Sequence, residues 1–124
     1  MQLYVLDELY AIVRCEPDAE LPRWIRGGHF WSATRSESEL SIVCRQDDVP
    51  VDASAERGFC AFEVAGPLDF SLTGVVASLV TPFAEAEIPV FVLSTFETDY
   101  LLVREHDLHR SVEALTNAGH SVDG

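Results

Sequence analysis

The chain has 124 residues, of which 48% are hydrophobic, and its 21 acidic against 8 basic residues give a formal net charge of −13. This length suits one ordinary domain or two very small ones, and the apolar residues are numerous enough to exclude a disordered chain. Because the negative charge repels nucleic-acid phosphates and anionic membrane surfaces, we expect neither as a partner. Acidity is compatible with cationic or zwitterionic small molecules, and equally with a simply well-solvated surface.

The cysteines Cys15, Cys44 and Cys60 lie in separate apolar stretches without a CxxC pair. Metal sites and disulfide frameworks use clustered or even sets, so we expect buried, reduced thiols in a cytoplasmic protein. The N-terminal MQLYVLDELY lacks the basic region of a signal peptide, and no apolar run approaches the roughly 18 residues of a membrane span.

The first half of the chain predicts mostly strands. Alternating and apolar runs bounded by turn residues indicate strands, and a short apolar group around Trp24 indicates a helix. The predicted elements are a strand Leu9–Cys15, a short helix Leu21–Ile25, a hairpin of His29–Arg35 with Glu39–Cys44, and a polar connection Gln46–Gly58.

The second half predicts a strand Phe59–Val64, a long helix Leu72–Glu87, a hairpin of Pro89–Thr95 with Thr98–Arg104, and a helix Glu105–Ala118. Apolar residues spaced 3, 1, 3, 1 and 3 mark the first helix. Asp69 and Ser71 precede it as candidate N-caps, and Pro82 should bend or shorten it. Gly119 is placed to end the second helix in a left-handed conformation, with a short strand after it.

The first half reads as a weaker copy of the second. Residues 34–43 align with residues 94–103 at a shift of 60, matching hydroxyl with hydroxyl and acid with acid, with aliphatic pairs at the end. We interpret this match as an internal duplication.

The segments Glu56–Gly58, Gly66–Leu79 and Ile88–Val103, with the Ser94-Thr95-Phe96-x-Thr98-Asp99-Tyr100 core, carry a family resemblance. They resemble the second half of small bacterial ACT-domain proteins and the ACT modules of the CASTOR cytosolic arginine sensors. The resemblance is specific over about residues 56–119 and looser over the first half. Two positions depart from the family pattern: Glu87 replaces a usual glycine, and Phe59-Cys60 replaces a usual Trp-Arg pair.

The resemblance implies an α+β fold of two tandem ACT-like, ferredoxin-like βαββαβ modules with antiparallel sheets and helices on one face. We expect modules at residues 1–57 and 58–124, and a homodimer formed through sheet edges or helical faces. It also implies an amino acid or similar small metabolite as ligand, held where a strand-to-helix loop meets a hairpin of a neighbouring module. The expected ligand-binding residues are Asp69, Ser71, Leu72, Thr73, Gly74, Val75, Thr95, Phe96, Thr98 and Asp99.

The chemistry of these residues suits such a ligand. Unpaired N–H groups at Leu72, Thr73 and Gly74, with the positive end of the helix dipole, could hold a carboxylate. Asp99 could accept a charge-assisted hydrogen bond from an ammonium or guanidinium group, and Phe96 could form an apolar wall. The alternative is purely structural, with Asp69 and Ser71 as caps, Thr98 and Asp99 as hairpin residues, and Phe96 as packing.

No catalytic residue, metal site or cofactor is indicated. His106 and His109 lie three apart on a helix but lack a third ligand, and His29 and His120 have no paired nucleophile. We therefore expect a non-enzymatic sensor acting on an unknown regulated protein. A dimerisation platform without a ligand, or a small enzyme of unrecognised type, remains the alternative.

Overall fold

The computed structural model describes residues 1–69 and 71–124. The chain forms two compact units, which we call the first unit (residues 8–59) and the second unit (residues 1–7 and 60–124). Strand β5, Ala55–Val64, contributes its beginning to the first unit and its end to the second. The division into domains 1–57 and 58–124 stays a prediction.

The second unit has the ferredoxin-like order. From β5 onward the elements are α1 (Val75–Glu85), β6 (Phe91–Ser94), β7 (Asp99–Arg104), α2 (Leu108–Asn117, after a 3₁₀ turn at Glu105–Asp107) and β8 (Ser121–Asp123). In the sheet β7 lies between β6 and β5, while β1 (Gln2–Val5) lies between β5 and β8. Strand β1 runs antiparallel to β5 and parallel to β8. This βαββαβ order confirms the α+β fold expected from the sequence.

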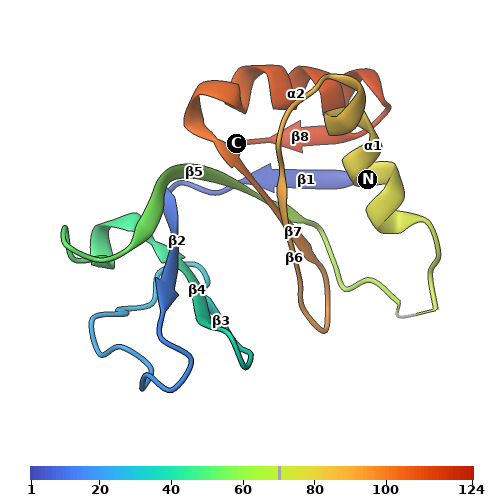
Figure 1. Cartoon of the computed structure of the whole chain (residues 1–124). Helices are drawn as coiled ribbons and strands as arrows, with labels where there is room; N and C mark the ends of the chain where they lie inside the picture. The colour runs from blue at the N-terminus through green and yellow to red at the C-terminus, as the bar shows by residue number, and fades with distance from the viewer. Residues whose placement is uncertain (70) are drawn as a thin grey trace. The chain divides into compact units, whose positions relative to one another are not determined.

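The helices of the second unit supply much of its core. Figure 1 shows α1 and α2 side by side next to β8 and β1. Leu79 and Phe83 of α1 and Leu115 of α2 are 0% exposed. The ring of Phe83 meets that of Phe62 on β5 edge-on, with centroids 6.4 Å apart. Burial of these apolar faces is the main force that holds both helices on the sheet.

The first unit is built from strands. Strand β4 (Leu40–Arg45) lies between β2 (Tyr10–Cys15) and β3 (Ser32–Arg35), and β2 also pairs with the beginning of β5. Among residues 8–59, all of which are described, there is a 3₁₀ turn at Gln46–Asp48 but no α-helix. Its buried cluster is covered instead by partly buried residues of the β2–β3 connection, Ala19, Trp24 and Ile25.

Several sequence predictions are corrected here. The prediction of a short helix at Leu21–Ile25 is wrong: this segment forms coil and a turn, because five residues are too few to form a stable helix alone. The polar connection Gln46–Gly58 already contains the start of β5. The sequence analysis assigned no strand to Gln2–Val5, which is β1. The strand after Gly119 and the left-handed Gly119, with φ +96°, are confirmed.

The start of α1 also differs from the prediction. The helix begins at Val75 and not at Leu72, and Gly74, with φ +74°, occupies the position before it. Asp69 and Ser71 are therefore not its N-caps. The Asp69 carboxylate accepts hydrogen bonds from the backbone N–H of Ser71 (2.8 Å) and from its hydroxyl (2.7 Å), which shapes the preceding turn instead.

The two hairpins are equivalent in structure, but the shift between them is 59 and not 60. Strand β3 ends opposite the start of β4 at Arg35 and Leu40, and β6 ends opposite β7 at Ser94 and Asp99, so that 94 − 35 and 99 − 40 both give 59. The 3₁₀ turns after each hairpin, at residues 46–48 and 105–107, keep the same shift. The alignment at 60 missed this because it matched residue types in the loop and not the hairpin register.

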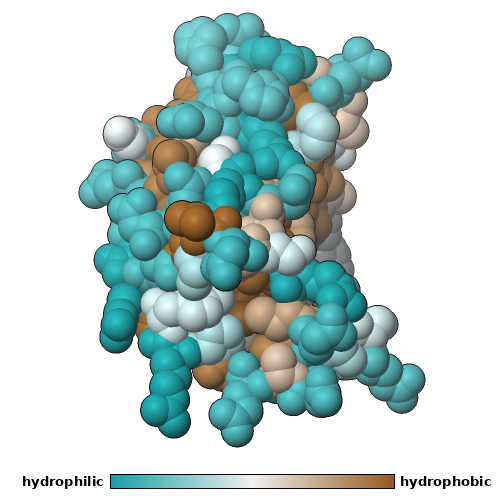
Figure 2. All heavy atoms as spheres, turned by 60° about the vertical axis from the view of Figure 1, so that its left-hand side comes forward, coloured by the Kyte–Doolittle hydropathy of each residue, from teal (hydrophilic) through white to brown (hydrophobic). Residues whose placement is uncertain are grey.

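The surface reflects the composition. The face drawn in Figure 2 is mostly hydrophilic, with apolar residues singly or in small groups. No α-helix among the described residues is long and apolar enough to cross a membrane.

Candidate functional site

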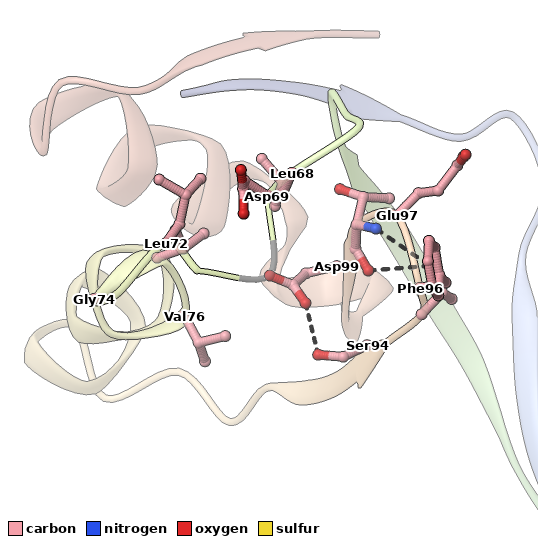
Figure 3. Close-up of a pocket in the computed structure, with 12 residues that line it drawn as sticks. Leu68, Asp69, Leu72, Gly74, Val76, Ser94, Phe96, Glu97 and Asp99 are labelled. Atoms are coloured by element: carbon pink, nitrogen blue, oxygen red, sulfur yellow. Dashed lines mark hydrogen bonds between the residues drawn. The ribbon is translucent and has the colours of Figure 1, made fainter.

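A hollow of about 250 Å³ lies in the second unit between the segment that leads into α1 and the β6–β7 hairpin. The strand-to-helix segment forms one wall and the hairpin tip forms the other, as Figure 3 shows. Its lining residues are Leu68, Asp69, Leu72, Gly74, Val75, Val76, Ser94, Thr95, Phe96, Glu97, Thr98 and Asp99.

The two walls are tied to each other by backbone contacts. The N–H of Leu68 donates to the carbonyl of Glu97 at 2.6 Å. Gly66 comes so close to the hairpin that an added Cβ would lie 3.0 Å from the Glu97 carbonyl oxygen. The Thr98 hydroxyl donates to the carbonyl of Val64 at 2.6 Å. Thr98 therefore holds the hairpin to β5, and its hydroxyl is already used there.

Asp99 is the buried acidic group of the site. It starts β7, is 7% exposed, and accepts a hydrogen bond from the Ser94 hydroxyl at 2.6 Å. In Figure 3 its carboxylate lies between the hairpin and the segment that carries Leu72 and Val76. A carboxylate has about four acceptor positions, so the Ser94 bond fixes its orientation and leaves capacity for a further donor.

The first turn of α1 opens on the same hollow. The first helical hydrogen bond runs from Ser78 N–H to the carbonyl of Gly74, so the N–H groups of Val75 and Val76 have no partner within the helix. The expectation of a free N–H group at Leu72 is wrong, since the N–H of Leu72 donates to the carbonyl of Asp69 at 3.0 Å. A Cβ added at Gly74 would meet nothing within 4 Å, so the backbone is open to close approach here.

The ionisable residues that line the hollow are all acidic. They are Asp69, Glu97 and Asp99, and none of the twelve lining residues is basic. The two hydrogen bonds from Ser71 lower the pKa of Asp69, so this carboxylate is charged at neutral pH. The hollow thus combines negative side chains with the positive end of a helix, and this arrangement complements a zwitterion.

The structure brings together most of the residues that the sequence singled out. Asp69, Leu72, Gly74, Val75, Thr95, Phe96, Thr98 and Asp99 line the hollow, whereas Ser71 and Thr73 do not appear in its lining. Phe96 lies at the hairpin tip and is 77% exposed. Their role in binding stays a prediction.

The sequence analysis missed Leu68, Val76, Ser94 and Glu97 as lining residues. Ser94 had a usable signal. It pairs directly with Asp99 across the hairpin, and paired residues point to the same face of a sheet.

The other candidate residues lie apart from this hollow. His106 and His109 contact different partners, Asp107 at 3.5 Å and Glu113 at 3.9 Å. No group of three or more potential metal ligands occurs among the described residues. Burial, reinforced by the nearby Asp48, raises the pKa of the Cys44 thiol to about 11. Burial also raises the pKa of Cys60, so both thiols are protonated at neutral pH.

The fold agrees with what a family comparison finds. A model of the ACT domain matches residues 54–117, which is more than half of the chain, and a separate model of an N-terminal domain matches residues 8–52. The chain belongs to the ACT-domain family.

The chain is similar to a bacterial protein and to part of a human one. An Agobacterium tumefaciens protein of known crystal structure is 42% identical in sequence to this chain. The two structures superpose with a TM-score of 0.91, and the superposition covers 98% of this chain and 90% of that one. The human protein named cytosolic arginine sensor for mTORC1 subunit 1 is 41% identical over 78 residues, which are 63% of this chain. The match spans only 22% of that sensor.

More distant structures share the fold. The regulatory subunit of aspartate kinase from Thermus thermophilus has a TM-score of 0.62 at 12% identity, with 92% of this chain and 94% of that one covered. The chain is therefore similar to domains with sensing and regulatory roles in other proteins.

Proposed function

We propose that this chain binds a free amino acid, or a metabolite with the same ammonium and carboxylate groups, in the hollow between the α1 segment and the β6–β7 hairpin. The observation that carries the proposal is the buried Asp99 carboxylate, which faces the open first turn of α1 across one small hollow. These two features offer an acceptor for a cation and donors for an anion.

The proposed pose places the ligand carboxylate at the N–H groups of Val75 and Val76, where the helix dipole favours negative charge. The ligand ammonium or a cationic side chain donates to Asp99. The volume of about 250 Å³ is below the roughly 300–1,000 Å³ of pockets for drug-sized molecules, which suits a small metabolite. The acidic lining favours amino acids with a cationic side chain.

Binding would serve regulation and not chemistry. The similar proteins are named as a sensor and as a regulatory subunit of a kinase. We therefore propose a non-enzymatic sensor in the cytoplasm, with modules at residues 1–57 and 58–124. Ligand binding would shift an equilibrium between arrangements of the modules or of a homodimer by no more than its differential affinity.

Thermal unfolding against the twenty amino acids tests this proposal. A ligand at about 100 times its dissociation constant adds about 2.7 kcal/mol of stability, which shifts the midpoint by several degrees for a chain of this size. Asp99→Asn should remove the shift, since it keeps the shape but loses the charge. Glu37→Gln, on the exposed loop of the other hairpin, is the matched control and should keep it.

If saturating amino acids leave the unfolding midpoint unchanged, the sensing proposal fails. The fold would then serve as a dimerisation platform.

A further inference from the structure

The first unit repeats the framework of the proposed site. In each unit a strand leads through a connection to a hairpin whose second strand pairs back with the first: β2, β3 and β4 in one, β5, β6 and β7 in the other. Both hairpin loops use the same hydrogen bonds. The N–H of Ser36 donates to the carbonyl of Glu39 at 2.9 Å, and that of Thr95 to the carbonyl of Thr98 at 2.8 Å. The hydroxyls of Ser36 and Thr95 reach the same carbonyls.

This register identifies the residues in the first unit that replace the polar pair of the site. Arg35 takes the place of Ser94, and Leu40 takes the place of Asp99. Leu40 is 2% exposed and belongs to the apolar core of its unit, so the position of the buried carboxylate is filled by an aliphatic group. A ligand cation would find no acceptor at this position.

The Arg35 guanidinium contacts the connection that follows β2. Its Nη1 donates to the carbonyl of Pro17 and its Nη2 to the carbonyl of Ala19, the latter at 2.6 Å. These carbonyls lie two and four residues after the end of β2 at Cys15. In the second unit Leu68, four residues after the end of β5, is likewise tied to the hairpin, but through its backbone. Arg35 thus spans the gap between hairpin and strand-to-strand connection with its own side chain.

We propose that Arg35 is a built-in substitute for a ligand: its guanidinium occupies the first unit's counterpart of the binding site and holds the Glu16–Trp31 connection against the β3–β4 hairpin. The chain then has one site for an external ligand, in the second unit. The bridging role of Arg35 stands independently, whereas its role as a ligand substitute and the count of one ligand per chain rest on the proposed function.

Hydrogen exchange of backbone amides, with and without methylguanidinium chloride at millimolar concentration, tests the role of Arg35. In Arg35→Ala, amides of the Glu16–Trp31 connection should exchange about threefold to tenfold faster, because two hydrogen bonds from a charged donor are lost. Methylguanidinium should restore slow exchange in this variant, and potassium chloride at equal ionic strength should not.

Arg110→Ala is the matched control. Arg110 lies in the second unit, is also exposed, and also donates to a backbone carbonyl, that of Ala86 at 2.7 Å. It should show neither the faster exchange of the connection nor the rescue. Should Arg35→Ala not fold, Arg35→Lys keeps the charge but not the fork of donors, and the amides of the connection should again exchange faster than in the wild type.

The proposal is overturned if amides of the connection exchange at the wild-type rate in the Arg35 variants. It is also overturned if methylguanidinium does not restore slow exchange in Arg35→Ala. The same measurement on the wild type with L-arginine separates the two proposals. Protection of residues 68–76 and 94–99 alone supports one site per chain, and added protection of residues 16–40 contradicts it. If L-arginine protects no residue, this counts against the proposed function and leaves the result for Arg35 intact.

Discussion

The two units of this chain share one arrangement of strands but cover it differently. In the second unit the connections after β5 and after β7 form α1 and α2, whose apolar faces bury Phe83 and Leu115 completely. In the first unit the corresponding connections, residues 16–31 and 46–54, form no α-helix, and Trp24 and Ile25 cover the core only in part. A helix that starts beside a hairpin creates the candidate site, and where the helix is missing Arg35 bridges the same gap.

The largest effect should come from the helical cover. Phe83→Ala should cost about 3–5 kcal/mol in the free energy of unfolding, because it opens a cavity in a fully buried contact with Phe62. Trp24→Ala removes a larger but half-buried side chain in the first unit and should cost less. Urea denaturation measures both, and equal losses would contradict the view that the helices supply the firmer core.

The first unit contains an ionic cluster in which Arg45 contacts Glu8 at 3.3 Å and Asp48 at 2.9 Å. Burial opposes the charge of Asp48, but hydrogen bonds from Arg45 and from the N–H of Arg26 outweigh it and hold its pKa below the usual range. A lowered pKa in the folded state adds stability that is present above the unfolded value near 4 and is lost as the pH falls below it.

Asp48→Asn should therefore cost about 1–3 kcal/mol at neutral pH. The difference from the wild type should shrink in unfolding measurements below pH 4. A difference that is the same at every pH would show that the charge of Asp48 does not contribute.

Cys44 gives a smaller, pH-dependent difference between the units. Val103 stands at its position in the second unit, 59 residues on. Because the folded state raises the pKa of Cys44 to about 11 from 9.0, its contribution is full below pH 9 and is lost as the pH rises through 11. Cys44→Val should flatten the fall in unfolding free energy between pH 9 and 11. If this variant keeps the wild-type slope, Cys44 does not titrate as described.

The smallest effect concerns the end of α1. Glu87 stands where the family usually has glycine, and it adopts a left-handed conformation with φ +56°. Glycine takes this conformation without steric cost, so Glu87→Gly should raise the unfolding free energy by up to about 1 kcal/mol. The neighbouring Glu85, the last residue of α1, is the control, since it is helical and Glu85→Gly should destabilise. Destabilisation by both changes would contradict this account of Glu87.

The second unit could be predicted from the sequence nearly element by element. Its helices carry clear periodic patterns, and its strands are apolar and bounded by Pro and Gly, so local preference and tertiary structure agree. Strand β1 could not be predicted, because four residues of ordinary composition gain their partners, β5 and β8, only from distant parts of the chain. The helix predicted at Leu21–Ile25 is wrong for a similar reason, because tertiary contacts decide the structure of this segment. Its apolar residues Trp24 and Ile25 pack against the core of the first unit without forming a helix.

The candidate site was predictable in location but not in detail. The family motif and the loop before α1 pointed to residues that line both walls of the hollow, although the resemblance placed the hairpin in a neighbouring module. The helix start was misplaced by three residues because Gly74, and not Asp69 or Ser71, precedes it. The equivalence of Arg35 with Ser94 could not be predicted either, since it depends on the register of the two hairpins. The alignment of residue types was shifted by one residue from that register.

The central claim is that the second unit binds an amino acid and that the first does not. Backbone amide NMR shifts during titration with L-arginine and L-lysine test it most directly. The account predicts saturable shifts for at least one of them at residues 68–76 and 94–99, none at residues 16–40, and loss of all of them in Asp99→Asn. Shifts of similar size in the first unit, or no shift at either site at saturating concentration, would contradict it.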